Sequence, residues 1–393
     1  MSPEEFLRLQ QPETIRLIEA NLDSDPAKVA LKTGDATVAT QVKMLQKSRR
    51  KLPSYFAARC IVPPLSYQQA SSEAAAFSRN LPGGSLAMDL TCGLGVDALA
   101  LSRMYDRVIA VEKDPLLAEI ARYNFARLGI GNVEVMTGPA EDFCIDWNGP
   151  RADLLLADPS RRTGQGRVVY SLEDSSPNIV GMLGRIGEIS FRQIFKLSPL
   201  FDVSAVFTVF GDEAEVEVVS VDGECKETVV RGGFGGGRVL CTVVRGDTVS
   251  RRSFPREDIG RPDPAAGGRI IPPAFILLPD VVFEKSRTVN ALLESYPDRK
   301  IRQHGGFIFA ERPIEGFEGR TYQIVDEYLF RPKELTRVLK ERGIRRANIY
   351  SRSGKHNPRL IAGLLKISLG GSVEFFFAEY EGEHYLFFVR RIS

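Results

Sequence analysis

The sequence predicts an α/β protein whose central part is a doubly wound, mostly parallel sheet. Two observations carry this prediction: short apolar segments recur through the middle of the chain, and helical periodicity separates the first three of them. Such alternation is typical of parallel strands joined by crossover helices, with ligands bound outside the carboxyl ends of the strands. The strand candidates are residues 86–90, 107–111, 133–136, 154–157 and 193–196, and the helix candidates between the first three strands are residues 96–104 and 115–129.

The composition indicates a folded globular protein in a reducing compartment. The 393 residues, 43% hydrophobic and 26% charged, are enough for about two to four domains. Five scattered cysteines without a CxxC pair, and three histidines, disfavour a disulfide framework and a metal site. No apolar run approaches the roughly 20 residues that span a bilayer, and the acidic start lacks a secretory pattern. We therefore expect a cytoplasmic protein with neither a metal nor a membrane partner, whose oligomeric state the sequence leaves open.

The first two thirds of the chain divide into two predicted domains. Residues 1–80 have apolar positions at helical spacing and are expected to form a helical N-terminal arm. Residues 81–250 hold the alternating strands and helices of the α/β domain. Its last part contains glycine-rich turns and no long helix, which predicts antiparallel strands that close the sheet. These later strand candidates are residues 215–221, 227–230 and 238–244.

The last third of the chain is expected to form two small α+β domains, residues 251–330 and 331–393. The proline- and glycine-rich stretch 251–273 predicts a linker in front of them. An amphipathic pattern predicts a helix over 332–342, and Asn357-Pro358 predicts the start of a second helix.

Lysine and arginine are unevenly distributed along the chain. Residues 36–72 contain no acidic residue, and the stretch from residue 331 onwards is also basic. Clustered cations are what a polyanion-binding surface needs, because each neutralised phosphate releases counterions. The alternative is that both runs are solvated faces of helices. The basic residues of the first run are Lys43, Lys47, Arg49, Arg50, Lys51 and Arg59.

Residues 88–97 (MDLTCGLGVD) end one predicted strand and open the next helix. Gly93 and Gly95 allow a tight turn and a close approach of the backbone to a ligand. The next strand ends in Glu112, an acid that suits the two hydroxyls of a ribose. Asp89 favours the cationic methionine end of S-adenosylmethionine over the pyrophosphate of a nicotinamide cofactor. The alternative is a tight turn without a ligand. The predicted cofactor-binding residues in this part are Asp89, Thr91, Gly93, Gly95, Asp97 and Glu112.

The loop after the third predicted strand begins Gly138-Pro139 and continues into two acids, Glu141 and Asp142. In this architecture such a loop meets the adenine of the cofactor, where a carboxylate accepts a hydrogen bond from the exocyclic amine. Either Glu141 or Asp142 would serve, and the pattern does not choose between them.

The fourth predicted strand ends in Asp158-Pro159-Ser160-Arg161-Arg162. This loop is expected to border the transferable methyl group, because ligands bind outside the carboxyl ends of the strands. The pattern is similar to the Asp/Asn-Pro-Pro-aromatic loop of amino-methylating enzymes. Asp158 would orient or deprotonate the acceptor, while Ser160 and Arg161 would position the substrate. In the alternative, the arginines pair with acids such as Glu173 or Asp174.

Together these motifs resemble the bacterial class I S-adenosylmethionine-dependent methyltransferase family with a C-terminal THUMP-like domain. The resemblance spans nearly the whole chain. It implies a Rossmann-like methyltransferase core at 81–250, a ferredoxin-like domain at 251–330 and a THUMP-like domain at 331–393. True THUMP domains bind RNA in tRNA-modifying enzymes, so the resemblance implies an RNA substrate, with tRNA among the candidates. The segments that carry it are residues 69–73, 89–97, 158–162, 176–177, 196–199, 224–227 and 349–354.

A covalent mechanism through cysteine is disfavoured. Uracil-5 methyltransferases share an Asp-Pro-Pro-Arg loop but attack through a cysteine after the fifth strand, where this chain has Lys196-Leu197-Ser198-Pro199. Three functions remain: a methyltransferase that grips RNA with the basic arm and tail, a methyltransferase of a protein or small molecule, and a cofactor-binding protein without turnover.

Overall fold

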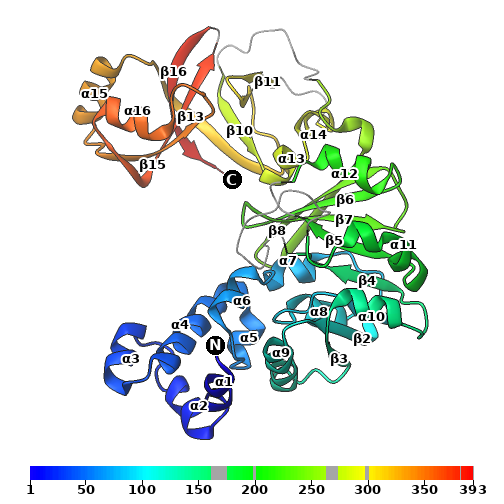
Figure 1. The fold of residues 1–393 in the computed structure, drawn as a ribbon. Helices are drawn as coiled ribbons and strands as arrows, with labels where there is room; N and C mark the ends of the chain where they lie inside the picture. The colour runs from blue at the N-terminus through cyan, green and yellow to red at the C-terminus, as the bar shows by residue number, and fades with distance from the viewer. Residues whose placement is uncertain (161–174, 198–200, 263–272, 297–300, 381, 393) are drawn as a thin grey trace. The chain divides into compact units, whose positions relative to one another are not determined.

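The computed structural model describes residues 1–160, 175–197, 201–262, 273–296, 301–380 and 382–392. The chain forms two compact units, Met1–Arg256 and Glu257–Ser393 (Figure 1). The first unit contains a nine-stranded sheet and the second a seven-stranded sheet.

The sheet of the first unit has the doubly wound topology that the sequence predicts. Its strand order is β3-β2-β1-β4-β5-β7-β6-β8-β9, and neighbouring strands among β1 to β5 are parallel. The order reverses between β1 and β4, which is the switch point at which such sheets bind ligands. The five predicted strands are confirmed, as β1 (Gly84–Asp89), β2 (Tyr105–Glu112), β3 (Val133–Thr137), β4 (Leu154–Ala157) and β5 (Gln193–Leu197).

Four further strands extend this sheet. As predicted, β7 is antiparallel to both β5 and β6, but β6 pairs in parallel with β8. Because β7 lies between β5 and β6, β8 can add only to the outer edge of β6, and a chain that reverses after β7 reaches that edge parallel to β6. Residues 251–255 belong to β9, so the predicted linker 251–273 is wrong at its start. The bounds are β6 (Glu215–Val221), β7 (Glu224–Gly232), β8 (Arg238–Arg245) and β9 (Thr248–Pro255).

Helices connect the strands and bury their apolar sides. The buried residues of α8 and α9 share one hydrophobic core with β1 and β2. Asp114 caps α9 by accepting hydrogen bonds from two backbone N–H groups, and Pro115 occupies the first turn, where its missing N–H costs nothing. The bounds are α8 (Val96–Ser102), α9 (Pro115–Arg127), α10 (Ala140–Asp146), α11 (Ile179–Ile189) and α12 (Val203–Phe210).

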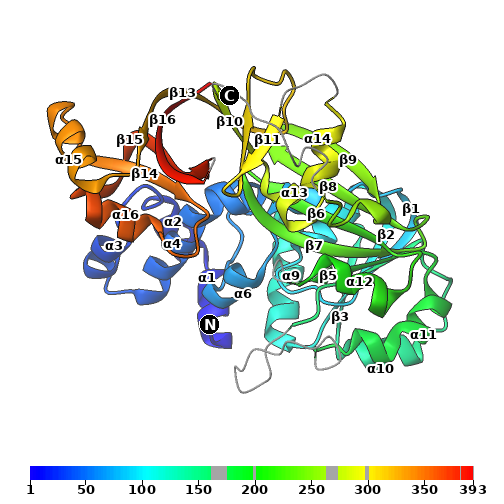
Figure 2. The same ribbon diagram turned by 90° about the horizontal axis from the view of Figure 1, so that it is seen from above.

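The N-terminal helices pack onto this same core rather than forming a separate one (Figures 1 and 2). The Asn124 side chain of α9 accepts a hydrogen bond from the Ile61 N–H and donates one to the Ile61 carbonyl, both at 2.9 Å. The bounds are α1 (Pro3–Leu9), α2 (Pro12–Glu19), α3 (Pro26–Thr33), α4 (Ala36–Lys51), α5 (Pro53–Ala57), α6 (Pro64–Gln69) and α7 (Glu73–Ser78).

The sheet of the second unit has the order β11-β12-β10-β13-β16-β15-β14. Its strands are β10 (Phe275–Pro279), β11 (Ile301–His304), β12 (Phe307–Ala310), β13 (Gly319–Leu329), β14 (Arg346–Ser351), β15 (Ser368–Tyr380) and β16 (Glu383–Arg391). Its helices are α13 (Val281–Lys285), α14 (Val289–Glu294), α15 (Pro332–Glu341) and α16 (Pro358–Leu365), and a 3-10 turn, η1 (Arg256–Asp258), precedes them.

The two C-terminal segments that the sequence separates at residue 331 share this sheet. β13 pairs in antiparallel register with β16, so both segments contribute strands to it. α15 and α16 share a hydrophobic core with one face of the sheet, while Phe376 and Phe387 belong to a second core with β10 and β12. The division at residue 331 stays a prediction.

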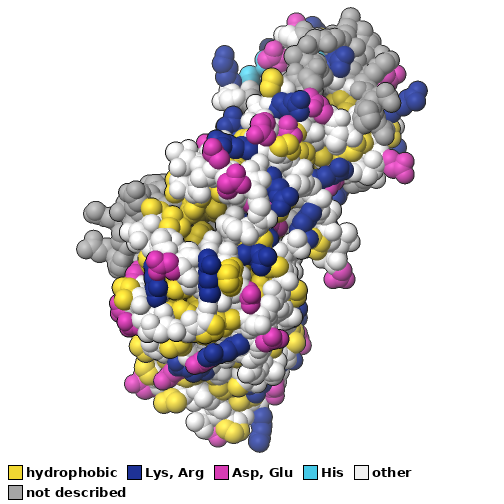
Figure 3. All heavy atoms as spheres, turned by 90° about the vertical axis from the view of Figure 1, so that its right-hand side faces the viewer, with side chains coloured by type: hydrophobic (Ala, Val, Ile, Leu, Met, Phe, Trp, Pro, Cys, Tyr) yellow, Lys and Arg dark blue, Asp and Glu magenta, His cyan; other side chains and the backbone are white. Residues whose placement is uncertain are grey.

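On the face drawn in Figure 3, Lys and Arg side chains are interspersed with Asp and Glu. Within the ranges given above, no helix combines the length and the apolar character that crossing a bilayer requires.

Candidate functional site

Three charged side chains stand at the carboxyl ends of neighbouring parallel strands. Asp89 is the last residue of β1, Asp158 directly follows β4, and Lys196 is the next-to-last residue of β5. The Asp158 N–H donates a 2.7 Å hydrogen bond to the Thr91 hydroxyl, which joins the end of β4 to the turn after β1. The three side chains therefore flank the switch point of the sheet, where a ligand is expected.

The turn after β1 requires glycine at two positions for different reasons. Gly93 and Gly95 both have left-handed backbone conformations, with φ of 54° and 85°. A Cβ on Gly95 would also lie 2.5 Å from the ring of Phe125, so packing excludes a side chain there. A Cβ on Gly93 would meet no heavy atom closer than 3.9 Å. The space beside Gly93 is therefore open to a ligand.

Asp89 is a buried carboxylate with one unused oxygen. Its Oδ1 accepts a 3.0 Å hydrogen bond from the Thr91 N–H, whereas Oδ2 is buried without a hydrogen-bond partner in the described part of the chain. Burial, reinforced by the charge of Asp97, raises the pKa of Asp89 to about 7. Because an unpaired buried carboxylate oxygen is costly, a cationic ligand that donates to it gains free energy. Asp89 thus fits the ammonium group of S-adenosylmethionine.

Glu112 braces the same turn from the end of β2. Its Oε2 accepts a 2.8 Å hydrogen bond from the Gly93 N–H, and its Oε1 accepts one of 2.9 Å from the Asp114 N–H. A carboxylate has about four lone-pair positions, so each oxygen keeps one for a further donor. Two ribose hydroxyls are donors of that kind, and Glu112 fits them.

Asp97 is held by an ion network inside the first unit. Its Oδ1 lies 2.6 Å from Arg79 and its Oδ2 lies 3.2 Å from Lys196, while both oxygens accept from the Ser71 hydroxyl. Burial alone would raise the pKa of Asp97, but the charges of Arg79 and Lys196 outweigh it and hold this pKa well below its usual range. Arg79 also pairs with Glu227 at 2.8 Å. Direct contact of Asp97 with a cofactor stays a prediction.

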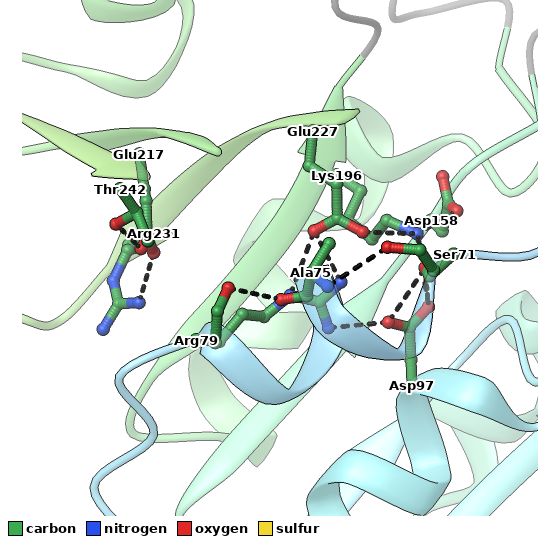
Figure 4. Close-up of polar contacts among 12 residues, drawn as sticks. Ser71, Ala75, Arg79, Asp97, Asp158, Lys196, Glu217, Glu227, Arg231 and Thr242 are labelled. Atoms are coloured by element: carbon green, nitrogen blue, oxygen red, sulfur yellow. Dashed lines mark hydrogen bonds and ion pairs between the residues drawn. The ribbon is translucent and has the colours of Figure 1, made fainter. Parts of the chain in front are cut away.

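Asp158 is paired with Lys196 (Figure 4). Lys196 Nζ lies 2.5 Å from Asp158 Oδ2, and the side chain of Lys196 is 7% exposed whereas that of Asp158 is 37% exposed. The carboxylate therefore borders open space and the ammonium lies behind it. Loss of hydration raises the pKa of Asp158, and the charge of Lys196 opposes this rise. Burial would lower the pKa of Lys196, but the surrounding carboxylates outweigh it and raise this pKa above its usual value.

Four residues of this network were given no role in the sequence analysis: Ser71, Arg79, Lys196 and Glu227. A signal existed, because residues 69–73, 196–199 and 224–227 are among the segments that carry the family resemblance. The sequence does not show which of these residues form ion pairs with one another, since Arg79 and Glu227, for example, are 148 positions apart.

The two acids predicted for the adenine lie in the first turn of α10. The Glu141 carboxylate accepts a 3.4 Å hydrogen bond from the Asn178 N–H, and Asp142 is exposed. Neither observation shows which of the two acids would contact the adenine, so the choice between Glu141 and Asp142 stays open.

The remaining predicted catalytic residues follow Asp158. Ser160 is exposed, and its backbone exchanges two hydrogen bonds with Ser176, at 2.8 and 2.9 Å. Arg161 lies outside the described residues, as do Glu173 and Asp174, so the predicted position of Arg161 and its alternative pairing both stay predictions.

The basic run at residues 43–59 is partly engaged within the first unit. Arg50 pairs with Asp222 at 3.2 Å. Lys51 donates a 2.6 Å hydrogen bond to the Tyr67 carbonyl, and burial lowers the pKa of Lys51 to about 8. These contacts favour a structural role for the two cations.

An open α/β sheet with a glycine turn and carboxylates at its switch point defines a Rossmann-like, cofactor-binding fold. The solved structure of a candidate methyltransferase from Porphyromonas gingivalis W83 shares this fold. The match covers 97% of this chain and 98% of that one, with a TM-score of 0.80 and 22% sequence identity. The predicted fold class, a Rossmann-like α/β core with a helical arm and small α+β parts, is confirmed.

Residues 319–391 match the family model described as THUMP domain-like, which confirms that part of the resemblance. The tRNA/tmRNA (uracil-C(5))-methyltransferase of Sodalis glossinidius is 33% identical over 107 residues, which are 24% of this chain and 29% of that protein. An uncharacterized S-adenosylmethionine-dependent methyltransferase of Mycobacterium tuberculosis is 29% identical over 153 residues, 37% of each chain. The chain spans about a third of the length of the curated relatives it matches.

Proposed function

We propose that this protein is an S-adenosylmethionine-dependent methyltransferase that modifies RNA in the cytoplasm. The observation that carries the proposal is the unused, buried Oδ2 of Asp89 beside the open space at Gly93. The names of the relatives support the same cofactor and chemistry. The five cysteines, four of them buried, form no disulfide in the described part of the chain, which suits a reducing compartment.

The residues of the first unit divide the work of binding and alignment. Asp89 and Thr91 hold the methionine end of the cofactor, and Glu112 holds its ribose. S-adenosylmethionine, when bound, supplies an already activated methyl group. Asp158 orients the acceptor and takes its proton. Asp97 acts indirectly, through its ion pairs with Arg79 and Lys196.

The charge of the C-terminal segment supports RNA as the substrate. Residues 331–393 contain 13 Lys and Arg against 6 Asp and Glu, a net charge of +7, although the whole chain carries only +2. Arg345 and Arg346 lie beside the start of β15: Ser368 N–H donates to the Arg345 carbonyl at 3.0 Å, and a Cβ on Gly370 would lie 3.4 Å from the Arg346 guanidinium. Lys366 precedes β15 by two residues. None of these three cations has a carboxylate partner within the part of the chain described above, so all three are available to phosphates.

The acceptor atom is a proton-bearing nitrogen or oxygen. Transfer to C5 of uracil uses a cysteine after the fifth strand, and this chain continues from β5 with Ser198 and Pro199. The relative named a tRNA methyltransferase makes tRNA the first RNA class to test.

The test of the proposal is transfer of a radiolabelled methyl group from S-adenosylmethionine to macromolecules from cells that lack this gene. We expect label that ribonuclease removes and protease does not, and none with Asp158→Asn. Label that protease removes, or label only in small molecules, would favour a methyltransferase of a protein or small molecule. Binding of the cofactor without any transfer would favour a cofactor-binding protein without turnover.

The matched control for RNA binding compares two triple variants. R345A/R346A/K366A is expected to lower the slope of log affinity against log salt by about 2–3, because each phosphate contact contributes about 0.7–0.9. R16A/K28A/K32A, which removes three cations from α2 and α3, is expected to leave the slope unchanged. Equal slopes for the two variants would remove the RNA-binding role of the C-terminal segment.

A further inference from the structure

Lys196 is surrounded by oxygen atoms from three separate parts of the first unit. Its Nζ lies 2.5 Å from Ser71 Oγ, 2.5 Å from Asp158 Oδ2 and 3.2 Å from Asp97 Oδ2 (Figure 4). An ammonium group has three N–H donors, and these acceptors use all of them. Lys196 therefore has no donor left for a substrate, whereas Asp158 Oδ1 has no hydrogen-bond partner among the residues that the structure describes.

We infer that Lys196 and Ser71 are positioning residues, which hold Asp158 in one orientation and ionised so that its free oxygen takes the proton of the methyl acceptor. The inference rests on the proposed function and extends it to two residues outside the predicted site. In the step, the acceptor N–H or O–H bond breaks and its proton moves to Asp158. The acceptor's electron pair forms the bond to the methyl carbon, and the electrons of the carbon–sulfur bond remain on sulfur.

The charges around Asp158 explain why this group, and no other member of the network, accepts the proton. Arg79 and Lys196 are balanced by Asp97 and Glu227, all four of them largely buried. Protonation of either of these two acids would remove one of the carboxylates that neutralise the buried Arg79 and Lys196, which is unfavourable. Asp158 is the fifth charge of the cluster and the most exposed one. When Asp158 is protonated, the two cations Arg79 and Lys196 remain balanced by the two acids Asp97 and Glu227.

The groups that face Asp158 come from every element packed around it. Thr91 adds a neutral contact, through the hydrogen bond from the Asp158 N–H to its hydroxyl. Among the described residues, the charged groups are Lys196 of β5, Asp97 of α8, Asp89 of β1, Glu227 of β7 and Arg79 after α7. Lys196 is the cation in direct contact, so its removal should make Asp158 harder to ionise.

Ser71 brings the N-terminal helices into the site. It lies in the link between α6 and α7 and is 8% exposed. Its hydroxyl accepts from Lys196 and donates to Asp97, so it fixes the direction of the ammonium group. Without it, one N–H of Lys196 would have no acceptor, and the ammonium group would be free to turn away from Asp158.

The test measures the ionisation of Asp158 directly and through catalysis. The carboxyl carbon of Asp158 is followed by ¹³C NMR against pH, with Asp158→Asn to assign its signal, and kcat/KM for methyl transfer is measured over the same range. Lys196→Met is expected to move both midpoints upward by about one pH unit or more, and to lower kcat near pH 7 by about 10- to 100-fold. Lys196→Arg should restore most of the shift, and Ser71→Ala should produce a smaller one.

The control is Lys226→Met, which removes a cation of β7 that pairs with Glu224 at 2.7 Å and does not touch the cluster. It should leave both midpoints in place. Unchanged midpoints in Lys196→Met would overturn the inference, as would a rate loss that is equal at all pH values and is not restored by arginine. If Lys196→Met does not fold, the same two midpoints are measured in Ser71→Ala: an upward shift supports the inference, and unchanged midpoints overturn it.

The NMR arm keeps this inference separate from the proposed function. If no RNA accepts a methyl group, the proposed function fails, while an upward shift of the Asp158 titration in Lys196→Met still supports the pairing. If RNA is methylated and the Asp158 titration is the same with and without Lys196, the proposed function stands and the positioning role is lost.

Discussion

The hydroxyl of Tyr55 donates a 2.7 Å hydrogen bond to the carbonyl of Leu94, the residue between the two glycines of the turn after β1. Tyr55 belongs to α5 and is fully buried. Burial, together with nearby cysteines and acids, raises its pKa well above the usual value, so the phenol remains a donor at neutral pH. The N-terminal helices thereby support the backbone that is expected to contact the cofactor.

Removing this hydroxyl should loosen the turn. Tyr55→Phe leaves the Leu94 carbonyl without its donor, and we expect the free energy of unfolding to fall by about 1–3 kcal/mol. Urea denaturation measures this loss, and calorimetry should show weaker S-adenosylmethionine binding. Tyr67→Phe is the control, because the Tyr67 hydroxyl donates to the backbone carbonyl of Lys47 at the surface. Equal losses in the two variants would contradict a special role for Tyr55.

The affinity for S-adenosylmethionine should depend on the ionisation of Asp89. Its pKa of about 7 means that the carboxylate, which attracts the ligand's ammonium group, forms as the pH rises through this value. The ligand's amine, with an ordinary pKa near 8, stays cationic in this range, so affinity should rise on the order of tenfold between pH 5.5 and 7.

Calorimetry at several pH values checks this dependence. Asp89→Asn has the same shape without the charge and should bind weakly with little dependence on pH. Asp106→Asn, at the exposed start of β2, should keep the wild-type dependence. A pH-independent affinity in the wild type would argue against Asp89 as the ammonium partner.

The buried network should contribute far more to stability than an exposed ion pair of similar length. Arg79→Met would leave Asp97 and Glu227 with fewer cations, and we expect a loss of about 3–5 kcal/mol in the free energy of unfolding. Arg107→Met removes an exposed 2.5 Å pair with Glu134 and should cost about 0–1 kcal/mol. Chemical denaturation measures the free energy of unfolding of both variants. Similar losses in the two would contradict the larger contribution of the buried network.

The two reasons for glycine at position 95 should be separable by mutation. Gly95→Ala adds a left-handed alanine, about 1–2 kcal/mol, and an overlap with Phe125 worth about 1–3 kcal/mol more. Gly129→Ala, with φ of 71° and nothing within 4 Å of its Cβ, should show the backbone cost alone. Thermal unfolding distinguishes the two variants. An equal decrease in both would mean that Phe125 moves aside freely.

Local pattern was enough to place the strands and the acids at their ends. A short apolar segment followed by a polar turn marks where a parallel strand stops, and Asp89, Glu112 and Asp158 were identified at such strand ends, Asp158 with the help of the similarity of its loop to a known motif. These features are encoded within about ten residues of one another, so sequence spacing carries them. Local spacing did not predict the order of the outer strands. The parallel pairing of β6 with β8 follows from the position of β7 between β5 and β6.

The partners of those acids were decided by the tertiary structure. Nothing near Asp97 in the sequence indicates that Arg79 and Lys196 neutralise it, and nothing near Asp158 indicates Lys196 behind it. A buried ion pair forms only when distant segments are brought together and dehydrated by the same core. The sequence by itself determined which acids stand at the carboxyl ends of the parallel strands, and packing determined which of them keep an oxygen without a partner among the described residues.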